Sequence, residues 1–295
     1  YHGWLFDVQG HCLDQPCEPG GGRARDRVRQ PWYPVREQYG LIFAYMGPSE
    51  RMPTLPRYEC LEVMDEGEFL DVDDTSIGSG GPAIAPCNWL QHFENVVDPF
   101  HVPILHGTFS GTQFTPTMNM MPQAVFEPTP YGVKVVSHRT LPDGGQFCRV
   151  TEVCLPTLRV VPNPRVGKFG RVETIGWTVP IDDTHYRIYT AGRVTEKGVM
   201  LPLGKDAAKV KPWADLTPAE RRARPNDYEA QIGQGPITLH SEEHLRTSDR
   251  GIVMLRRLLE REVKAVAEGR DPVGVSFEAD APPIVFEAGQ HIVAE

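Results

Sequence analysis

The stretch Asn95–His106, which reads NVVDPFHVPILH, places His101 and His106 five residues apart and Asp98 three residues before the first of them. Imidazole nitrogens are common ligands of transition metals. Side chains five residues apart diverge by roughly 140° in a regular α-helix, but the two prolines of the stretch prevent such a helix. Both rings can therefore turn toward one ion, with Asp98 accepting a hydrogen bond from a ring N–H. Nearby histidines also serve in cores and on surfaces, so the stretch alone leaves a structural role open.

Helices and strands are predicted on both sides of this stretch. Residues 87–97 form a helix in our interpretation, because their apolar members fall on one broad side. We expect a kink at Pro99 and then a short helical piece that carries the histidines. Segments rich in β-branched and aromatic residues, separated by turns, predict strands at 132–138, 148–161, 171–180 and 185–192. Successive strands without intervening helices favour an antiparallel sheet. An apolar stripe predicts a long helix from Ser248 to Gly269.

The beginning of the chain differs in character. Residues 1 to about 31 are rich in glycine, proline and polar residues, and residues 34–47 read as a hairpin. Three prolines within nine residues, at positions 48, 53 and 56, are typical of a linker. We therefore predict one domain over residues 1–58 and a second over residues 59–295. The fold class is α+β.

Composition excludes some classes of partner. The net charge of −9 argues against nucleic acid or an anionic membrane surface. No apolar run approaches the roughly 18–20 residues that a membrane helix needs. The six cysteines show no CxxC spacing and are interpreted as reduced thiols of a cytoplasmic protein.

Three motifs together resemble those of Rieske non-haem iron oxygenases, in particular the α subunits of the phthalate dioxygenase-like group. Residues 94–107, ENVVDPFHVPILHG, fit the family pattern N-x-x-D-x-x-H-x4-H. Residues 1–10, YHGWLFDVQG, are similar to the second half of the cluster motif C-P-Y-H-G-W. Residues 226–259 carry further family features, including NDY at 226–228 and GQGPI at 233–237. The resemblance thus covers most of the chain.

The resemblance implies a mononuclear Fe(II) held by two histidines and one carboxylate, which leaves other positions open for dioxygen. The ligands would be His101, His106 and a downstream aspartate, for which Asp227 lies where the group carries it. The competing carboxylates are Asp182 and Asp183, which read as turn residues, and Glu229 and Glu243.

The resemblance also implies that Asp98 carries electrons to this iron from a Rieske [2Fe-2S] cluster, usually of a neighbouring subunit. His2 matches one histidine ligand of that cluster. A Rieske centre needs two cysteines and two histidines, and Cys12 and Cys17 do not have the C-x-x-H spacing. We therefore expect an N-terminally truncated, all-β Rieske domain that does not hold the cluster by itself.

Other residues remain open between two roles. Asn95, one helical turn before Asp98, either hydrogen-bonds at the metal site or is a polar residue of the helix surface. His92 lies outside the family pattern and is interpreted as structural. His240 and His244 have a spacing that can bind metal, but they match a non-ligand region of the family.

The predicted function is the oxygenase component of an aromatic ring-hydroxylating system. It would use O2 and electrons from an NAD(P)H-dependent reductase or ferredoxin to hydroxylate or demethylate a small aromatic substrate, such as a carboxylated ring. The group usually forms homotrimers, and its catalytic domain has a helix-grip (START-like) architecture. The alternative is a helix-grip protein that binds a small ligand without redox activity.

Overall fold

The computed structural model describes residues 1–73, 81–164, 169–197, 211 and 213–293 of the 295 residues. The chain divides into two compact units, Tyr1–Pro53 and Thr54–Glu295. This division falls within the proline-rich segment, five residues before the expected boundary. Each unit is described by itself.

The first unit consists of two small antiparallel pairs and short 3-10 helices. Strand β1 (Leu5–Phe6) pairs with β2 (Cys12–Asp14), and β3 (Val35–Gln38) pairs with β4 (Leu41–Ala44). The turn of the second pair needs positive φ at both central residues, Tyr39 (55°) and Gly40 (76°), as in a type I′ hairpin. The 3-10 helices are η1 (Pro19–Gly21), η2 (Arg25–Arg27) and η3 (Ser49–Arg51).

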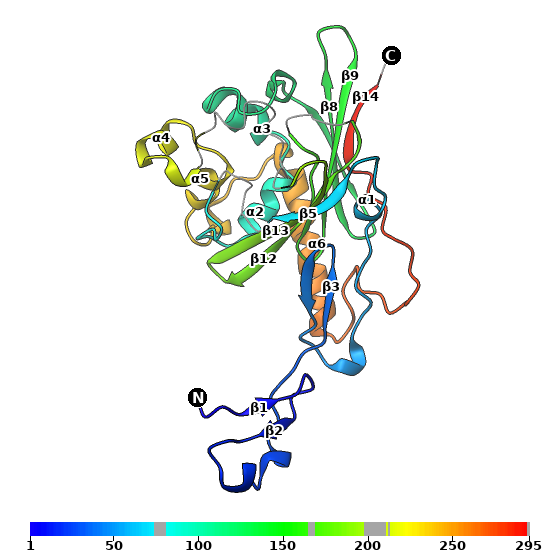
Figure 1. The fold of residues 1–295 in the computed structure, drawn as a ribbon. Coiled ribbons are helices and arrows are strands. Elements are labelled where there is room, and N and C mark those ends of the chain that lie inside the picture. The colour runs from blue at the N-terminus through cyan, green and yellow to red at the C-terminus, as the bar shows by residue number, and fades with distance from the viewer. Residues whose placement is uncertain (74–80, 165–168, 198–210, 212, 294–295) are drawn as a thin grey trace. The chain divides into compact units, whose positions relative to one another are not determined.

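A nine-stranded antiparallel sheet forms the second unit (Figure 1). Its strands are β5 (Phe69–Asp73), β7 (Gln123–Pro128), β8 (Gly132–Thr140), β9 (Gln146–Cys154), β10 (Leu158–Val160), β11 (Gly170–Arg171), β12 (Thr174–Asp182), β13 (His185–Val194) and β14 (Gly289–Val293). The sheet runs from β7 through β8 to β9, which pairs on its other side with β10 and β14. From β10 it continues through β12 and β13 to β5.

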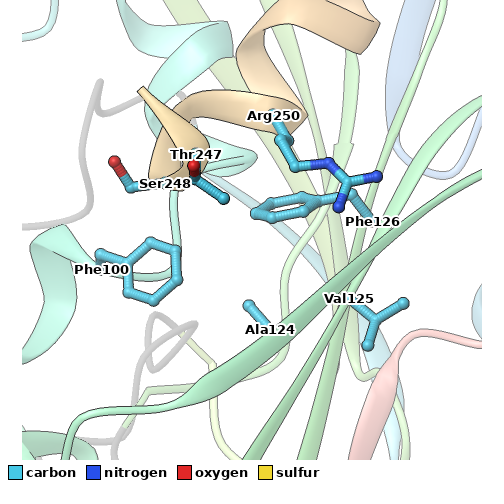
Figure 2. A pocket seen from close by; sticks show the side chains of 7 residues that line it. All are labelled: Phe100, Ala124, Val125, Phe126, Thr247, Ser248 and Arg250. Atoms are coloured by element: carbon cyan, nitrogen blue, oxygen red, sulfur yellow. The ribbon is translucent and has the colours of Figure 1, made fainter. Parts of the chain in front are cut away.

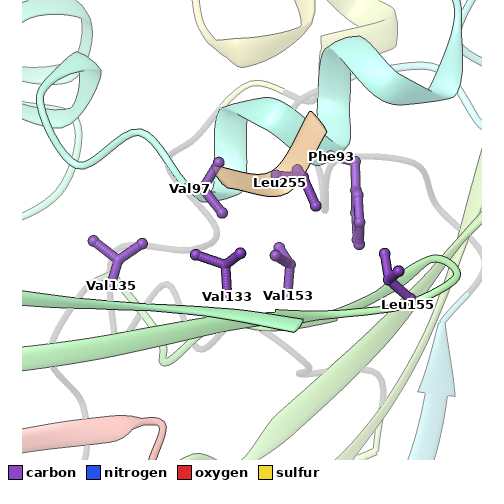
Figure 3. Close-up of a cluster of buried hydrophobic side chains, with 7 residues drawn as sticks. All are labelled: Phe93, Val97, Val133, Val135, Val153, Leu155 and Leu255. Atoms are coloured by element: carbon purple, nitrogen blue, oxygen red, sulfur yellow. The ribbon is translucent and has the colours of Figure 1, made fainter. Parts of the chain in front are cut away.

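Two helices cover one face of this sheet. Helix α2 (Trp89–Val96) and the long helix α6 (Arg250–Ala267) direct Phe93, Val97 and Leu255 onto the sheet. Figure 3 shows these side chains facing the valines and the leucine of β8, β9 and the turn after β9. The two helices approach closely at Gly251, where a Cβ would lie 2.6 Å from the carbonyl oxygen of Val97. The predicted antiparallel sheet packed on a long C-terminal helix is confirmed.

The remaining helical segments are short. They are α1 (Glu59–Glu62), α3 (His101–Pro103), the π-helix η4 (Ile104–Phe109), η5 (Pro116–Asn119), η7 (Trp213–Asp215), α4 (Pro218–Ala223), α5 (Asp227–Ile232), η8 (His240–Glu242) and η9 (Thr247–Asp249). None of the helices within the described ranges has the length and apolar character required to cross a membrane.

Candidate metal centre

The chain between α2 and η4 changes direction around Asp98. Helix α2 begins at the Asn88 cap, whose side chain accepts a hydrogen bond from the Leu90 N–H, and it ends before Pro99. The Asp98 carboxylate then accepts hydrogen bonds from the backbone N–H groups of Phe100 (2.8 Å) and His101 (3.4 Å), which starts a new helical turn. The predicted kink and short helical continuation are both present. Carboxylates are preferred at such a position because they satisfy otherwise unpaired N–H groups.

A π-helical turn brings the two histidines to the same side. His101 begins α3, and His106 lies in η4, a π-helix, so the two rings lie 5.4 Å apart between centroids. The wider π turn changes the angle between side chains five residues apart, and such turns occur often at functional sites. A regular α-helix would have separated the rings.

Asp227, the first residue of α5, faces both rings. Asn226 caps this helix through a reciprocal arrangement with Glu229. The Asp227 Oδ1 atom lies 3.0 Å from Nε2 of His106 and 3.5 Å from Nε2 of His101. The three possible ligand atoms all lie within 4.8 Å of one another, so a single ion can reach all three.

Hydrogen bonds on the far side of each ring determine which nitrogen is free. Nδ1 of His106 donates to Oε1 of Gln113 (2.6 Å), whose amide NH2 in turn donates to the Pro225 carbonyl oxygen (3.1 Å). Nδ1 of His101 donates to the carbonyl oxygen of Asp98 (2.6 Å). A neutral imidazole has one N–H donor and one lone pair, so both Nε2 lone pairs point toward Asp227. Histidine ligands of metals are oriented in this way.

The resulting arrangement of acceptors fits a cation. Two imidazole lone pairs and a carboxylate oxygen face one another with no proton to share, in surroundings where His106 is 2% exposed and Asp227 17%. Such acceptors repel one another unless a metal ion or an added proton lies between them. Burial alone would raise the pKa of Asp227, but a positive charge on the facing His106 and His101 rings outweighs it and lowers that pKa, as an added proton between the acceptors would. Burial likewise opposes a raised pKa for His101, yet Asp98 and Asp227 raise it.

The structure places the other residues predicted for the site as follows. The Asn95 amide donates to Oδ1 of Asp227 at 3.3 Å, so this side chain contacts the carboxylate of the cluster. The Asp98 side chain remains 30% exposed, with one carboxylate oxygen 3.7 Å from Nδ1 of His101. His2 is exposed and belongs to the first unit.

The competing acidic residues do not belong to the cluster of His101, His106 and Asp227. Asp182 accepts hydrogen bonds from Thr184 and His185 within its turn. Glu229 completes the cap of α5 and accepts from the Trp213 indole N–H. The backbone carbonyl of Asp183 accepts a hydrogen bond from Asn88.

Two features of this region were not predicted from the sequence. Gln113 supports His106 from a position seven residues away, and no motif indicates that role. The second is a cluster formed by Glu94, His240 and Glu243, whose possible ligand atoms also lie within 4.8 Å of one another. Arg256 of α6 forms ion pairs with both carboxylates of this cluster.

A surface pocket of about 290 Å³ lies beside the loop that follows Asp98 (Figure 2). It is lined by Phe100, Ala124, Val125, Phe126, Thr247, Ser248 and Arg250. No member of the His101, His106 and Asp227 cluster lines it, so it is separate from the candidate metal centre.

Comparison with known proteins identifies the family. The α subunit of phenoxybenzoate dioxygenase from Ectopseudomonas oleovorans is 46% identical over 286 residues, which cover 95% of this chain and 69% of that protein. This chain belongs to the oxygenase subunits of the Rieske oxygenase family. The oxygenase subunit of tert-butanol monooxygenase / tert-amyl alcohol desaturase from Aquincola tertiaricarbonis is 32% identical, with coverage of 93% and 61%. No protein-family model matches the chain.

A solved structure shows the same fold. The NdmA QL mutant of Pseudomonas putida CBB5, solved with caffeine, aligns with a TM-score of 0.60 at 17% identity and covers 96% of this chain and 77% of that one. The predicted enzyme class, a Rieske-type oxygenase, is confirmed by the family. Its members use iron, a Rieske cluster, dioxygen and a ferredoxin or reductase.

Proposed function

We propose that His101, His106 and Asp227 hold a mononuclear Fe(II) and that the protein is an oxygenase component acting on an aromatic substrate. One observation carries this proposal: two histidine lone pairs, each fixed by a hydrogen bond on the far side of its ring, meet one partly buried carboxylate. Two histidines and one carboxylate are the donor set of non-haem iron oxygenases. Bound there, the iron would supply the activation of dioxygen.

The surrounding residues fix the ligands and limit access of water. Gln113 and the Asp98 carbonyl hold the protons on Nδ1 of the two rings, which keeps each Nε2 available. Asn95 donates to Oδ1 of Asp227 and restricts the rotation of the carboxylate. Phe114 packs against the His106 ring with centroids 4.4 Å apart, which shields one side of that ligand.

In this proposal Asp98 is the path for electrons. Its backbone carbonyl accepts from the His101 ring, while its side chain is partly exposed and has a carboxylate oxygen 3.7 Å from the same ring. Burial would raise the pKa of Asp98, but the hydrogen bond with His101 and those from backbone N–H groups lower it, so the side chain is an anionic acceptor at neutral pH. A histidine that ligates the [2Fe-2S] cluster of a neighbouring subunit would donate to it.

The cluster itself would involve the first unit. His2 is the ligand that this unit supplies in our proposal. Cys12 is buried with its thiol toward the Asp14 carbonyl oxygen, and Cys17 is exposed, so neither is oriented as a partner of His2 by any described contact. We further propose a homotrimer that receives electrons from an NAD(P)H-dependent reductase or a ferredoxin. The name of the relative that is 46% identical favours a carboxylated aromatic substrate.

Iron content tests this proposal against the alternative of a ligand-binding protein without redox activity. After anaerobic reconstitution with Fe(II), we expect one iron per chain at the mononuclear site, measured by metal analysis. A protein that carries this chain and a Rieske cluster should then incorporate oxygen from ¹⁸O2 into aromatic acids or ethers, detected by mass spectrometry. A reconstituted protein that holds no iron at this site would favour the ligand-binding alternative.

A further inference from the structure

The helix that carries Asp227 is too short to fix its own position. Helix α5 has six residues and therefore fewer than two turns, and a helix of this length gains little stability from its own backbone hydrogen bonds. Asp227 is its first residue, so a slide or rotation of α5 would move the carboxylate relative to the rings of His101 and His106. Packing against neighbouring elements must therefore determine where this carboxylate lies.

Gln231 lies one turn after Asp227 and is buried. Residues four apart lie on the same face of a helix, and both of these side chains contact α2, which lies beside α5 (Figure 1). The Gln231 residue is only 2% exposed. A buried amide is costly unless its donors and acceptors are paired, so the partners of Gln231 restrict where α5 can pack.

The side-chain amide of Gln231 joins α5 to both α2 and the sheet. Its Oε1 atom accepts a hydrogen bond from the Tyr186 hydroxyl of β13 at 2.6 Å, and its NH2 group donates to Nδ1 of His92 in α2 at 3.2 Å. The rings of His92 and Tyr186 stack with centroids 5.4 Å apart, so the two partners also contact each other. Both hydrogen bonds form together only when α5 has one height along α2 and one distance from β13.

Burial keeps both partners of this amide in the protonation state that the hydrogen bonds require. It lowers the pKa of His92 to about 3, so the ring is neutral at pH 7 and Nδ1 has a lone pair that can accept. It raises the pKa of Tyr186, so the hydroxyl keeps the proton that it donates. The two hydrogen bonds of Gln231 are therefore present throughout the neutral pH range.

The polar contacts between α2 and α5 form two levels. At the first, the Asn95 amide donates to Oδ1 of Asp227 at 3.3 Å. At the second, about one turn away on each helix, Gln231 donates to His92, and the Gln91 amide donates to the backbone carbonyl oxygen of Gln231 at 2.8 Å. A helix moves as a unit over so few residues, so the second level sets the register at which the first can form.

We propose that Gln231 is a positioning residue for the metal centre. Its amide sets the register of α5 against α2 and β13 and thereby holds the Asp227 carboxylate against the Nε2 atoms of His101 and His106. The proposal rests on the function proposed above, in which Asp227 is a metal ligand. Ligand atoms that are held together before an ion arrives raise the affinity, because less ordering is needed on binding.

Metal binding by the full chain tests this role. Gln231→Leu removes both side-chain hydrogen bonds at similar side-chain volume. We expect the affinity for Fe(II), measured anaerobically by competition with a chelator, to fall about tenfold, at the lower end of the range for residues that support metal ligands. Co(II) bound in place of iron reports the geometry, because its visible absorption depends on the number and arrangement of its ligands. We expect that absorption to change in Gln231→Leu.

Two further variants separate the hydrogen bonds from packing. Tyr186→Phe removes only the hydroxyl and should cause a smaller loss of affinity; the double variant should lose no more than Gln231→Leu alone, because the two changes remove one shared hydrogen bond. Gln231→Glu still offers an oxygen to Tyr186 and should stay closer to the wild-type affinity than Gln231→Leu. If Gln231→Leu does not fold, unchanged affinity in Tyr186→Phe would overturn the inference.

Two controls distinguish positioning from a general loss of stability. Gln234→Leu changes an exposed glutamine three residues further along the chain, whose Oε1 accepts from the Thr238 hydroxyl. Arg256→Met breaks the ion pairs with Glu94 and Glu243, neither of which lies on α5. Both variants should keep the wild-type Fe(II) affinity and Co(II) absorption.

Two results with folded proteins would overturn the inference. One is wild-type Fe(II) affinity and Co(II) absorption in Gln231→Leu, and the other is an equal loss of affinity in Arg256→Met and Gln231→Leu. If the wild-type protein binds one Fe(II) per chain and Asp227→Ala does not, the proposed metal centre stands in either case and only the positioning role fails. A wild-type protein that binds no Fe(II) would instead contradict the proposed function.

Discussion

Two clusters of histidine and carboxylate in this unit have similar geometry but different surroundings. In the first, formed by His101, His106 and Asp227, all possible ligand atoms lie within 4.8 Å, and the same is true of the second, formed by Glu94, His240 and Glu243. The first has no arginine or lysine ion pair within the described part of the chain. In the second, the Arg256 guanidinium binds both carboxylates.

The difference shows that distances between ligands do not define a metal site. The second cluster already has its cation, because Arg256 donates two hydrogen bonds to each glutamate, and His240 is exposed. Its structural effect is to join α2 and α6. In the first cluster the ring N–H groups are used on the far sides of the rings, so the two ring nitrogens that face Asp227 are acceptors. The hydrogen bonds that surrounding residues donate to the carboxylates therefore decide which cluster needs a metal ion.

The largest expected effect is loss of iron from Asp227→Ala. Removal of one of three ligands should weaken iron binding more than the roughly 10–100-fold that loss of a supporting hydrogen bond costs. The apo protein should remain folded, because Asp227 lies in the first turn of α5 and the Asn226 cap of that helix is unchanged. Metal analysis and thermal unfolding measure the two effects. Glu243→Ala is the matched control from the second cluster and should keep full iron content; loss of iron in that variant alone would reverse the assignment.

Substitution of Asp98 should separate iron binding from turnover. Asp98→Asn keeps an oxygen that can accept from the Phe100 N–H, so the helix start and the iron should remain. Because the negative charge is removed, we expect turnover coupled to the electron donor to fall to background, measured as product formed per NAD(P)H consumed. Asp98→Ala should also keep iron and lose coupled turnover. Normal turnover in Asp98→Asn would assign the residue a purely structural role.

The sequence predicts the local features of the first cluster well. The prolines indicate the break after α2, and the apolar spacing indicates α2 and α6, because these patterns depend on neighbours within a few turns. The antiparallel sheet follows from the uninterrupted series of strands. The assignment of Asp227 came only from the resemblance to the family, since 121 residues separate it from His106 and no local pattern links them.

Other features depend on contacts that sequence spacing does not encode. The role of Gln113 requires the turn after η4 to return its amide to His106. The role of Gln231 requires α5 to pack against both α2 and β13, which are distant from it in the sequence. From the sequence alone, Arg256 is one of several basic residues on an amphipathic helix. Its ion pair with Glu94 depends on how α2 packs against α6.

Substitution of Arg256, the positively charged partner of the second cluster, is expected to have a moderate effect on stability. Arg256→Met leaves two partly buried carboxylates without their partner; the exposed fractions of Glu94 and Glu243 are 11% and 20%. We expect a loss of about 2–3 kcal/mol in the free energy of unfolding at pH 7, less than for a fully buried pair. Denaturant unfolding measures this loss, and iron content should not change.

The pH dependence of this loss follows from Glu243. Its hydrogen bond with Arg256 lowers its pKa in the folded protein below the usual 4.5. A carboxyl group with a lowered folded pKa contributes stability above the unfolded value and loses it as the pH falls through the folded value. The difference between wild type and Arg256→Met should therefore shrink below about pH 4.5. A difference that stays constant from pH 7 to pH 3 would contradict the ion pair as its cause.

The smallest expected effect is on metal affinity, through the support of His106. Gln113→Leu removes the acceptor for the Nδ1 proton at similar side-chain volume, so the ring is free to rotate or change tautomer. We expect iron affinity to fall by roughly 10–100-fold, as for other supporting residues of metal ligands, measured by competition with a chelator. Gln113→Glu offers the same acceptor and should stay near the wild-type affinity. Equal affinities in Gln113→Leu and wild type would show that η4 alone orients His106.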